Sequence, residues 1–85
     1  MKKKISTKQL LAETAGWYGT VAILSAYILV SFNVISGNSV PFQLLNLTGA
    51  LGIIAIASYK KVTQSIVLNI FWGIVAVVAI VKILV

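Results

Sequence analysis

The polar side chains set inside long apolar stretches are the residues of this sequence that could do chemistry. They are carboxamides, hydroxyls and one indole, namely Gln43, Asn46, Asn69, Trp72, Thr20, Tyr27 and Ser31. Such groups form hydrogen bonds without carrying charge. Within a membrane they either hold helices together or line a cavity for a small neutral solute.

Acid–base and nucleophilic chemistry lack the side chains they need. The sequence contains no His, Cys, Asp or Arg, and Glu13 is its sole acidic residue. General acid–base pairs, activated nucleophiles and metal clusters therefore cannot be assembled within one chain. We expect no enzyme, no catalytic residue, no metal and no cofactor.

Glu13 lies in a short segment, Leu11-Ala12-Glu13 followed by Gly16. This segment superficially resembles the one that carries the membrane carboxylate of the small multidrug resistance exporters. In those proteins the acid lies deep in the first of four helices. A deep carboxylate is costly, and here Lys8 stands only five residues earlier. We expect Glu13 at the wet interface, near Lys8 or near the lysines at 60 and 61.

The elements that must position these residues are three apolar segments, at 15–35, 40–59 and 65–84. Each is near the ~20 residues that cross a bilayer. The chain is 60% hydrophobic and 9% charged, a balance that a soluble domain of this size could not cover with polar surface. The sequence predicts an all-α membrane protein, with three transmembrane helices in an antiparallel up-down-up bundle over 15–85 and a basic interfacial segment at 1–14.

Capping and turn residues support these boundaries. Ser6 followed by Gln9 fits a capping box that extends the first helix toward the N-terminus. Ser39 can cap the second span, and Pro41 falls in its first turn, where the missing N–H does no harm. Lys60 lies at the negative end of the same helix.

The lysines predict the orientation. Six of the seven fall in the N-terminal segment and the second loop, which share one side in a three-span protein: Lys2, Lys3, Lys4, Lys8, Lys60 and Lys61. Only Lys82 falls on the other side of the membrane. The positive-inside rule then predicts a multi-pass protein of the bacterial inner (plasma) membrane, with the N-terminus in the cytoplasm and Val85 outside. The partners expected are anionic lipid headgroups, and nucleic acid is excluded because no basic stripe interleaved with aromatic residues occurs.

At about 100° per residue, each helix has one face that combines small and polar residues. The three faces are Gly16, Thr20, Ile23, Tyr27, Ser31 and Val34; Gln43, Asn46, Ala50, Ile53 and Ala57; and Ser65, Asn69, Trp72, Ala76 and Ala79. This composition drives helix association in lipid. We therefore expect each face to be a packing seam.

The asparagines have two interpretations. Counted from the second loop, Asn69 is level with Thr20, and Asn46 is level with residues 27–31, so two interhelical hydrogen bonds of ~0.6 kcal/mol each could clamp the bundle. Alternatively, Gln43, Asn46 and Asn69 line a polar cavity completed by a second subunit, and Trp72 either fills a seam or walls that cavity. Clamping is the preferred interpretation.

The motifs Gly16-Trp17, Ala26-Tyr27, Gln43-Leu44-Leu45-Asn46-Leu47 with Gly49-Ala50, and Leu68-Asn69 followed by Trp72 together suggest a family. The chain resembles a family of uncharacterised small three-helix bacterial membrane proteins, some of them labelled permease or transporter. The resemblance implies that Asn46, Asn69 and Trp72 belong to the family pattern. A remote architectural analogy holds with the bacterial sugar half-transporters, although here Phe42 separates Pro41 from Gln43.

Three functions follow from this reading. The first is a small membrane protein that acts through helix association, as a homo-oligomer or as an accessory subunit of a larger complex. The second is an oligomeric permease or channel-like transporter of a small neutral solute. The third, a holin-like pore former, suits the size, but those proteins often carry their basic cluster at the C-terminus.

Overall fold

A computed structural model of the chain describes residues 5–85. Three helices account for most of them: α1 (Thr7–Ser31), α2 (Val40–Lys60) and α3 (Thr63–Leu84). No strand occurs within this described range. All three helices are long and apolar enough to cross a membrane. The expectation of an all-helical chain with three potential spans is confirmed.

The starts of α1 and α2 are formed by the residues that the sequence indicated. The Ser6 Oγ accepts a hydrogen bond from the Gln9 N–H at 3.1 Å, so α1 begins eight residues before the predicted span. The Ser39 Oγ accepts from the Phe42 N–H at 3.4 Å, and Pro41 lies in the first turn of α2. These caps satisfy N–H groups that a helix start leaves unpaired.

The end of α1 differs from the prediction, because the helix stops at Ser31 and residues 32–35 form turns. Asn33 adopts a left-handed conformation with φ 60°, which its short polar side chain tolerates. The Val34 N–H then bonds the Leu29 carbonyl at 2.8 Å, and the Asn33 N–H bonds the Val30 carbonyl at 3.1 Å. This is a Schellman ending, which satisfies carbonyls that the helix would otherwise leave open.

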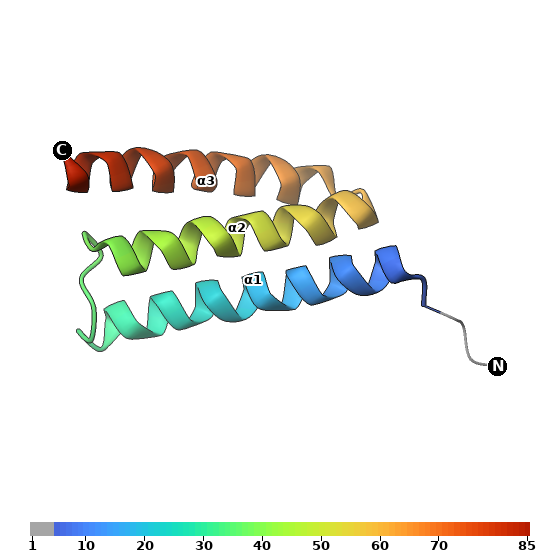
Figure 1. Ribbon diagram of the computed structural model, residues 1–85, viewed down its shortest axis with the longest axis horizontal. Helices are drawn as coiled ribbons and strands as arrows, with labels where there is room; N and C mark the ends of the chain where they lie inside the picture. The colour runs from blue at the N-terminus through green and yellow to red at the C-terminus, as the bar shows by residue number, and fades with distance from the viewer. Residues whose placement is uncertain (1–4) are drawn as a thin grey trace.

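The same ending joins α2 to α3. Lys61 is left-handed with φ 59°, and the Val62 N–H bonds the Ala57 carbonyl at 2.8 Å. α3 starts at Thr63, so this connection is shorter than the predicted loop of residues 60–64. The tight reversal places α3 antiparallel to α2 and beside it (Figure 1).

The helices form a layer rather than a closed three-helix bundle. α2 lies between α1 and α3, which do not meet through their backbones within the described residues (Figure 1). The cause is the placement of contacts around α2: Gly49 packs on α1, whereas Leu47 is the nearest side chain to Gly73 of α3. Those two residues are about 200° apart on a helix. α1 and α3 therefore lie on nearly opposite sides of α2.

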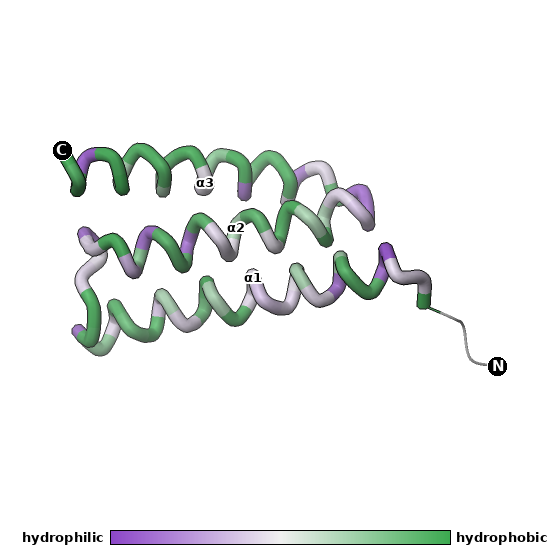
Figure 2. Tube along the Cα trace, in the orientation of Figure 1, coloured by the Kyte–Doolittle hydropathy of each residue, from purple (hydrophilic) through white to green (hydrophobic). Residues whose placement is uncertain are grey.

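Small residues fill the contacts between helices. The buried apolar side chains are all alanines, namely Ala12, Ala22, Ala26, Ala50, Ala57 and Ala76. Large apolar side chains, by contrast, face outward along all three helices. Figure 2 shows the hydrophilic positions gathered mainly toward the helix ends and along α2, while most of α3 is hydrophobic. Small residues between helices and large ones outside are the pattern of helix packing in lipid.

The closest approach is between the backbones of α1 and α2. A Cβ on Gly19 would collide with the Gly49 carbonyl oxygen, and one on Gly52 would collide with the Ala15 carbonyl oxygen. A Cβ on Gly16 would lie 2.6 Å from the Ile56 side chain. Two pairs with the same spacing, Gly16 with Gly19 and Gly49 with Gly52, therefore set the distance between the two helices.

Replacing Gly52 with alanine should destabilise the α1–α2 pair, because the new methyl group meets backbone atoms that cannot move aside. We expect Gly52→Ala to lower the free energy of unfolding in mixed micelles by about 1–3 kcal/mol. The matched control is Gly73→Ala, whose Cβ would meet only the Leu47 side chain, at 3.8 Å. That variant should stay within about 0.5 kcal/mol of the parent. Equal losses in both variants would show that the glycine contact does not hold the helices together.

Candidate functional site

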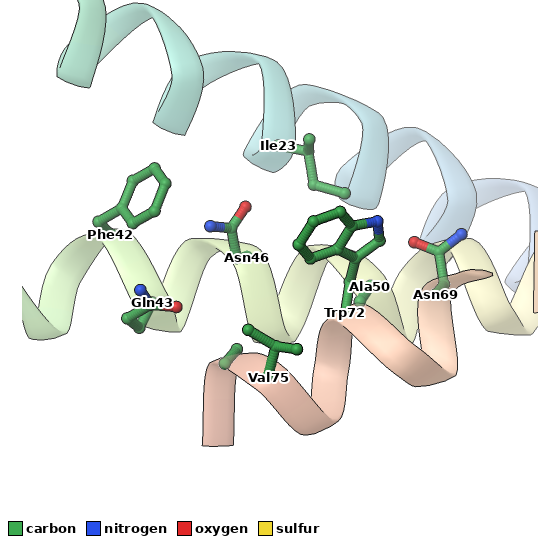
Figure 3. Close-up of a pocket in the computed structure, with 9 residues that line it drawn as sticks. Ile23, Phe42, Gln43, Asn46, Ala50, Asn69, Trp72 and Val75 are labelled. Atoms are coloured by element: carbon green, nitrogen blue, oxygen red, sulfur yellow. The ribbon is translucent and has the colours of Figure 1, made fainter. Parts of the chain in front are cut away.

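A groove of about 310 Å³ runs over α2 between α1 and α3. All three helices contribute to its lining, which consists of Ile23, Phe42, Gln43, Asn46, Ala50, Asn69, Trp72, Val75 and Ala76 (Figure 3). We call it the amide groove, and we call the side of the layer onto which it opens the open face. The three predicted carboxamides and Trp72 thus share one cavity.

The groove extends through much of the membrane span. Gln43 lies three residues from the start of α2, and Asn69 lies six residues from the start of the antiparallel α3. At 1.5 Å per residue, they are roughly 4 Å and 9 Å from opposite ends of the layer. The carboxamides are therefore distributed at different depths, as the sequence predicted.

Asn46 makes no hydrogen bond to any described residue; its neighbours in the groove use part of their capacity. The Gln43 Nε2 donates to the Gly37 carbonyl at 3.2 Å. The Asn69 Nδ2 donates to the Ser65 carbonyl at 2.9 Å. The carboxamide oxygens of Gln43 and Asn69 thus stay free to accept, and Asn46 keeps both its donor and its acceptor.

These free atoms face the groove and are not sealed inside the protein. Asn69 is only 8% exposed, yet among the described residues no fully buried side-chain oxygen or nitrogen lacks a partner. Its free Oδ1 is therefore accessible, and Figure 3 shows it on the side of Trp72. Asn46 points from α2 into the same space in Figure 3.

Trp72 forms a wall of the groove. Its side chain is 53% exposed, so it does not fill a packing seam. The ring lies between Asn46 and Asn69 in Figure 3, and Phe71 supports it edge to face with ring centroids 5.8 Å apart. An indole held in this way offers a flat apolar surface bordered by amide groups.

The two predicted asparagine clamps are not formed in the described residues. The Thr20 Oγ1 donates to the Gly16 carbonyl at 2.9 Å within its own helix, and Asn69 likewise bonds within α3. Tyr27 is 71% exposed, and Ser31 is exposed as well. The Thr20–Asn69 bond is absent because α2 separates α1 from α3. Asn46 lies on the neighbouring helix, but the exposed Tyr27 and Ser31 side chains do not bond it.

The predicted faces are thus only partly packing seams. On α1, Thr20 and Tyr27 share a helical face with Ile23, which lines the amide groove, so they too turn toward the open face. The seam between α1 and α2 uses Gly19, Gly49 and Gly52 instead. Sequence reasoning missed these glycines as a packing contact, although small residues inside an apolar span are a signal of close helix approach.

The side-chain hydrogen bond that does join two helices lies away from the groove. The Tyr18 hydroxyl and the Thr48 Oγ1 are 2.7 Å apart. Since the Thr48 hydroxyl also donates to the Leu44 carbonyl at 2.8 Å, its oxygen is left to accept the Tyr18 proton. This bond stabilises the α1–α2 pair that the glycines bring together.

Apart from Lys82, which lies in the last turn of α3, the charged residues that the structure describes lie at the end of the layer that holds the α2–α3 connection. The Lys60 Nζ is 3.5 Å from the Glu13 Oε2, and the Glu13 side chain is about one-third exposed, at 34%. The expectation that Glu13 lies beside the lysine loop is confirmed. Lys8 and Lys61 are exposed at the same end. The predicted membrane-surface residues Lys2, Lys3 and Lys4 lie outside the described residues.

Removing the Tyr18 hydroxyl should weaken the α1–α2 pair, because membrane hydrogen bonds of this kind average ~0.6 kcal/mol and reach ~1.7 kcal/mol. We expect Tyr18→Phe to lower the free energy of unfolding by that amount, and a double-mutant cycle with Thr48→Val to show the same coupling energy. Tyr27→Phe is the control, since the Tyr27 hydroxyl bonds no described residue and its loss should change nothing. A coupling energy of zero would mean that the bond contributes nothing to stability.

Comparison with known proteins places the chain in a family without adding an activity. Neither a curated protein nor a solved structure shows significant similarity to it. The motif residues and the analogy with sugar half-transporters stay predictions. A family model matches residues 12–85, nearly the whole chain, and the protein therefore belongs to that uncharacterised family.

Proposed function

We propose that this chain is a membrane subunit that works by associating with a second copy of itself, the open faces of the two copies turned toward each other. The observation that carries the proposal is the set of free carboxamide groups in the amide groove. An unsatisfied polar group in hydrocarbon costs several kcal/mol. A lone copy in lipid would leave these groups uncovered.

A second copy suits this face because the face is complementary to itself. No charged side chain lines the amide groove among the described residues, so the surface does not select an oppositely charged partner. Carboxamides both donate and accept, so the free groups of two facing grooves can be satisfied across the interface, directly or through a polar molecule held between them. Two-fold pairs, in which the same patch meets itself, are the commonest oligomers. Association as an accessory subunit of a larger complex would use the same face against a different protein.

Transport of a small neutral solute is the second candidate function. Two amide grooves facing each other would enclose a polar space at the interface, although three helices alone cannot surround a pathway. The position of Trp72 in the groove wall favours this candidate over a purely structural seam. Catalysis is not proposed, because the chain has no His, Cys, Asp or Arg.

Cysteine crosslinking tests the association directly, since the chain has no cysteine of its own. In native membranes, Asn46→Cys and Tyr27→Cys should each give a crosslinked dimer with short bifunctional thiol reagents. Leu51→Cys is the matched control, because Leu51 is 57% exposed but lies about 140° around α2 from Asn46. It should remain monomeric on the same gel.

Two results would contradict this arrangement. A dimer formed by Leu51→Cys but not by the two open-face variants would move the interface to the other side of the layer. Crosslinks from the open-face variants to a different protein, without any dimer, would replace self-association with the accessory-subunit role.

We further propose that the chain lies in the bacterial inner membrane with its N-terminus in the cytoplasm, on the lysine distribution. A reporter enzyme that is active only in the periplasm, fused after Val85, should be active. The same reporter inserted in the α2–α3 connection at Val62 should be inactive. The reverse pair of activities, from fusions expressed at equal levels, would show the opposite orientation.

A further inference from the structure

We infer that the amide groove binds an uncharged, ring-shaped polar solute, which lies flat on Trp72 and bonds the free groups of Asn46 and Asn69, the two amides on either side of that ring (Figure 3). The inference rests on the proposed association, because a second copy is what closes the groove against lipid.

The size of the groove fits a small molecule. Its volume of about 310 Å³ is at the lower end of the range for ligand pockets, about 300–1,000 Å³. The lining is mostly apolar and has a few convergent polar groups, which is the usual composition of such sites. A small solute is therefore the occupant that matches the volume and lining of the groove.

The free hydrogen-bonding groups of the groove determine which polar groups the ligand must carry. Asn46 offers a donor and an acceptor side by side, while Asn69 offers a carboxamide oxygen. A ligand that fills the groove without bonding these atoms would leave them unpaired in a dry site, at a cost for each atom. The ligand must therefore carry both donors and acceptors.

The charge and the shape of the groove narrow the class of ligand further. None of the nine lining residues is charged, and the nearby ionic groups Glu13 and Lys60 already pair with each other outside the groove. A charged ligand would lose its hydration without gaining a counter-ion. The exposed indole of Trp72, between Asn46 and Asn69, provides a flat apolar surface on which a ring can stack (Figure 3). Cyclic polyols and nucleobases share these properties.

Trp72 can itself report on binding. The chain has two tryptophans, so Trp17→Phe leaves Trp72 as the sole indole. This variant, in lipid vesicles, is titrated with glucose as the uncharged polyol ring and with uracil as the uncharged nucleobase ring. At least one should change the Trp72 emission saturably. Glucuronate and orotate, the carboxylated counterparts, should bind at least about tenfold more weakly, since about 1.4 kcal/mol of lost interaction suffices for that factor.

Two leucine variants test whether the solute binds in the amide groove. In the Trp17→Phe background, Asn46→Leu should weaken binding by roughly fivefold or more, because one hydrogen-bonding amide is lost. It should not unfold the protein, since Asn46 bonds nothing in its own subunit. Asn38→Leu removes an exposed amide from the loop before α2 and should bind as well as the parent. Equal binding by all three proteins would overturn the assignment.

The dimer crosslink, measured in the same vesicles with Tyr27→Cys, separates this inference from the proposed function. If the dimer forms and neither neutral ring changes the Trp72 emission, or the carboxylates bind equally well, the ligand class is wrong and the association stands. If a neutral ring binds but no dimer forms, the site is correct and self-association is wrong.

Discussion

The direct contact between the backbones of α1 and α2 is the constraint on which the rest of the structure depends. Gly19 faces the Gly49 carbonyl oxygen and Gly52 faces the Ala15 carbonyl oxygen, with no room for a side chain at either glycine. Lipid is as apolar as leucine, so helices in a membrane gain little from burying large side chains against one another. Close backbone approach, with the dispersion contacts that it allows, is what remains to hold them.

The open layer follows from that contact. α1 occupies the glycine side of α2, and α3 packs elsewhere, near Leu47. One face of α2 is then left between the two neighbours, and Asn46 lies on it. A triangular bundle would have covered Asn46 with a third helix, whereas the layer leaves its amide open to the groove.

The polar groups divide into two kinds according to their partners. Thr20, Thr48 and Asn69 donate to carbonyls of their own helix, which lets hydroxyls and amides enter an apolar span at small cost. Asn46 has no such partner among the described residues, and it differs from the others for that reason. A polar group without an internal bond within a membrane span needs a second subunit, water or a solute, and this requirement connects the fold to the proposed function.

The sequence by itself determined the three apolar helices, the capping roles of Ser6 and Ser39, and the position of Glu13 near lysines at the interface, because these depend on local composition, helix ends and charge. It left open whether Glu13 lies near Lys8 or near Lys60, and the structure shows the pair with Lys60. It also determined which residues share a face of each helix, since that follows from the helical repeat. Only the tertiary structure decided where each face points. Thr20 and Asn69 were predicted to bond and do not, because the glycine contact between distant segments places α2 between them. The local sequence does not predict the contact between α1 and α2, because that contact depends on how two backbones fit together in space.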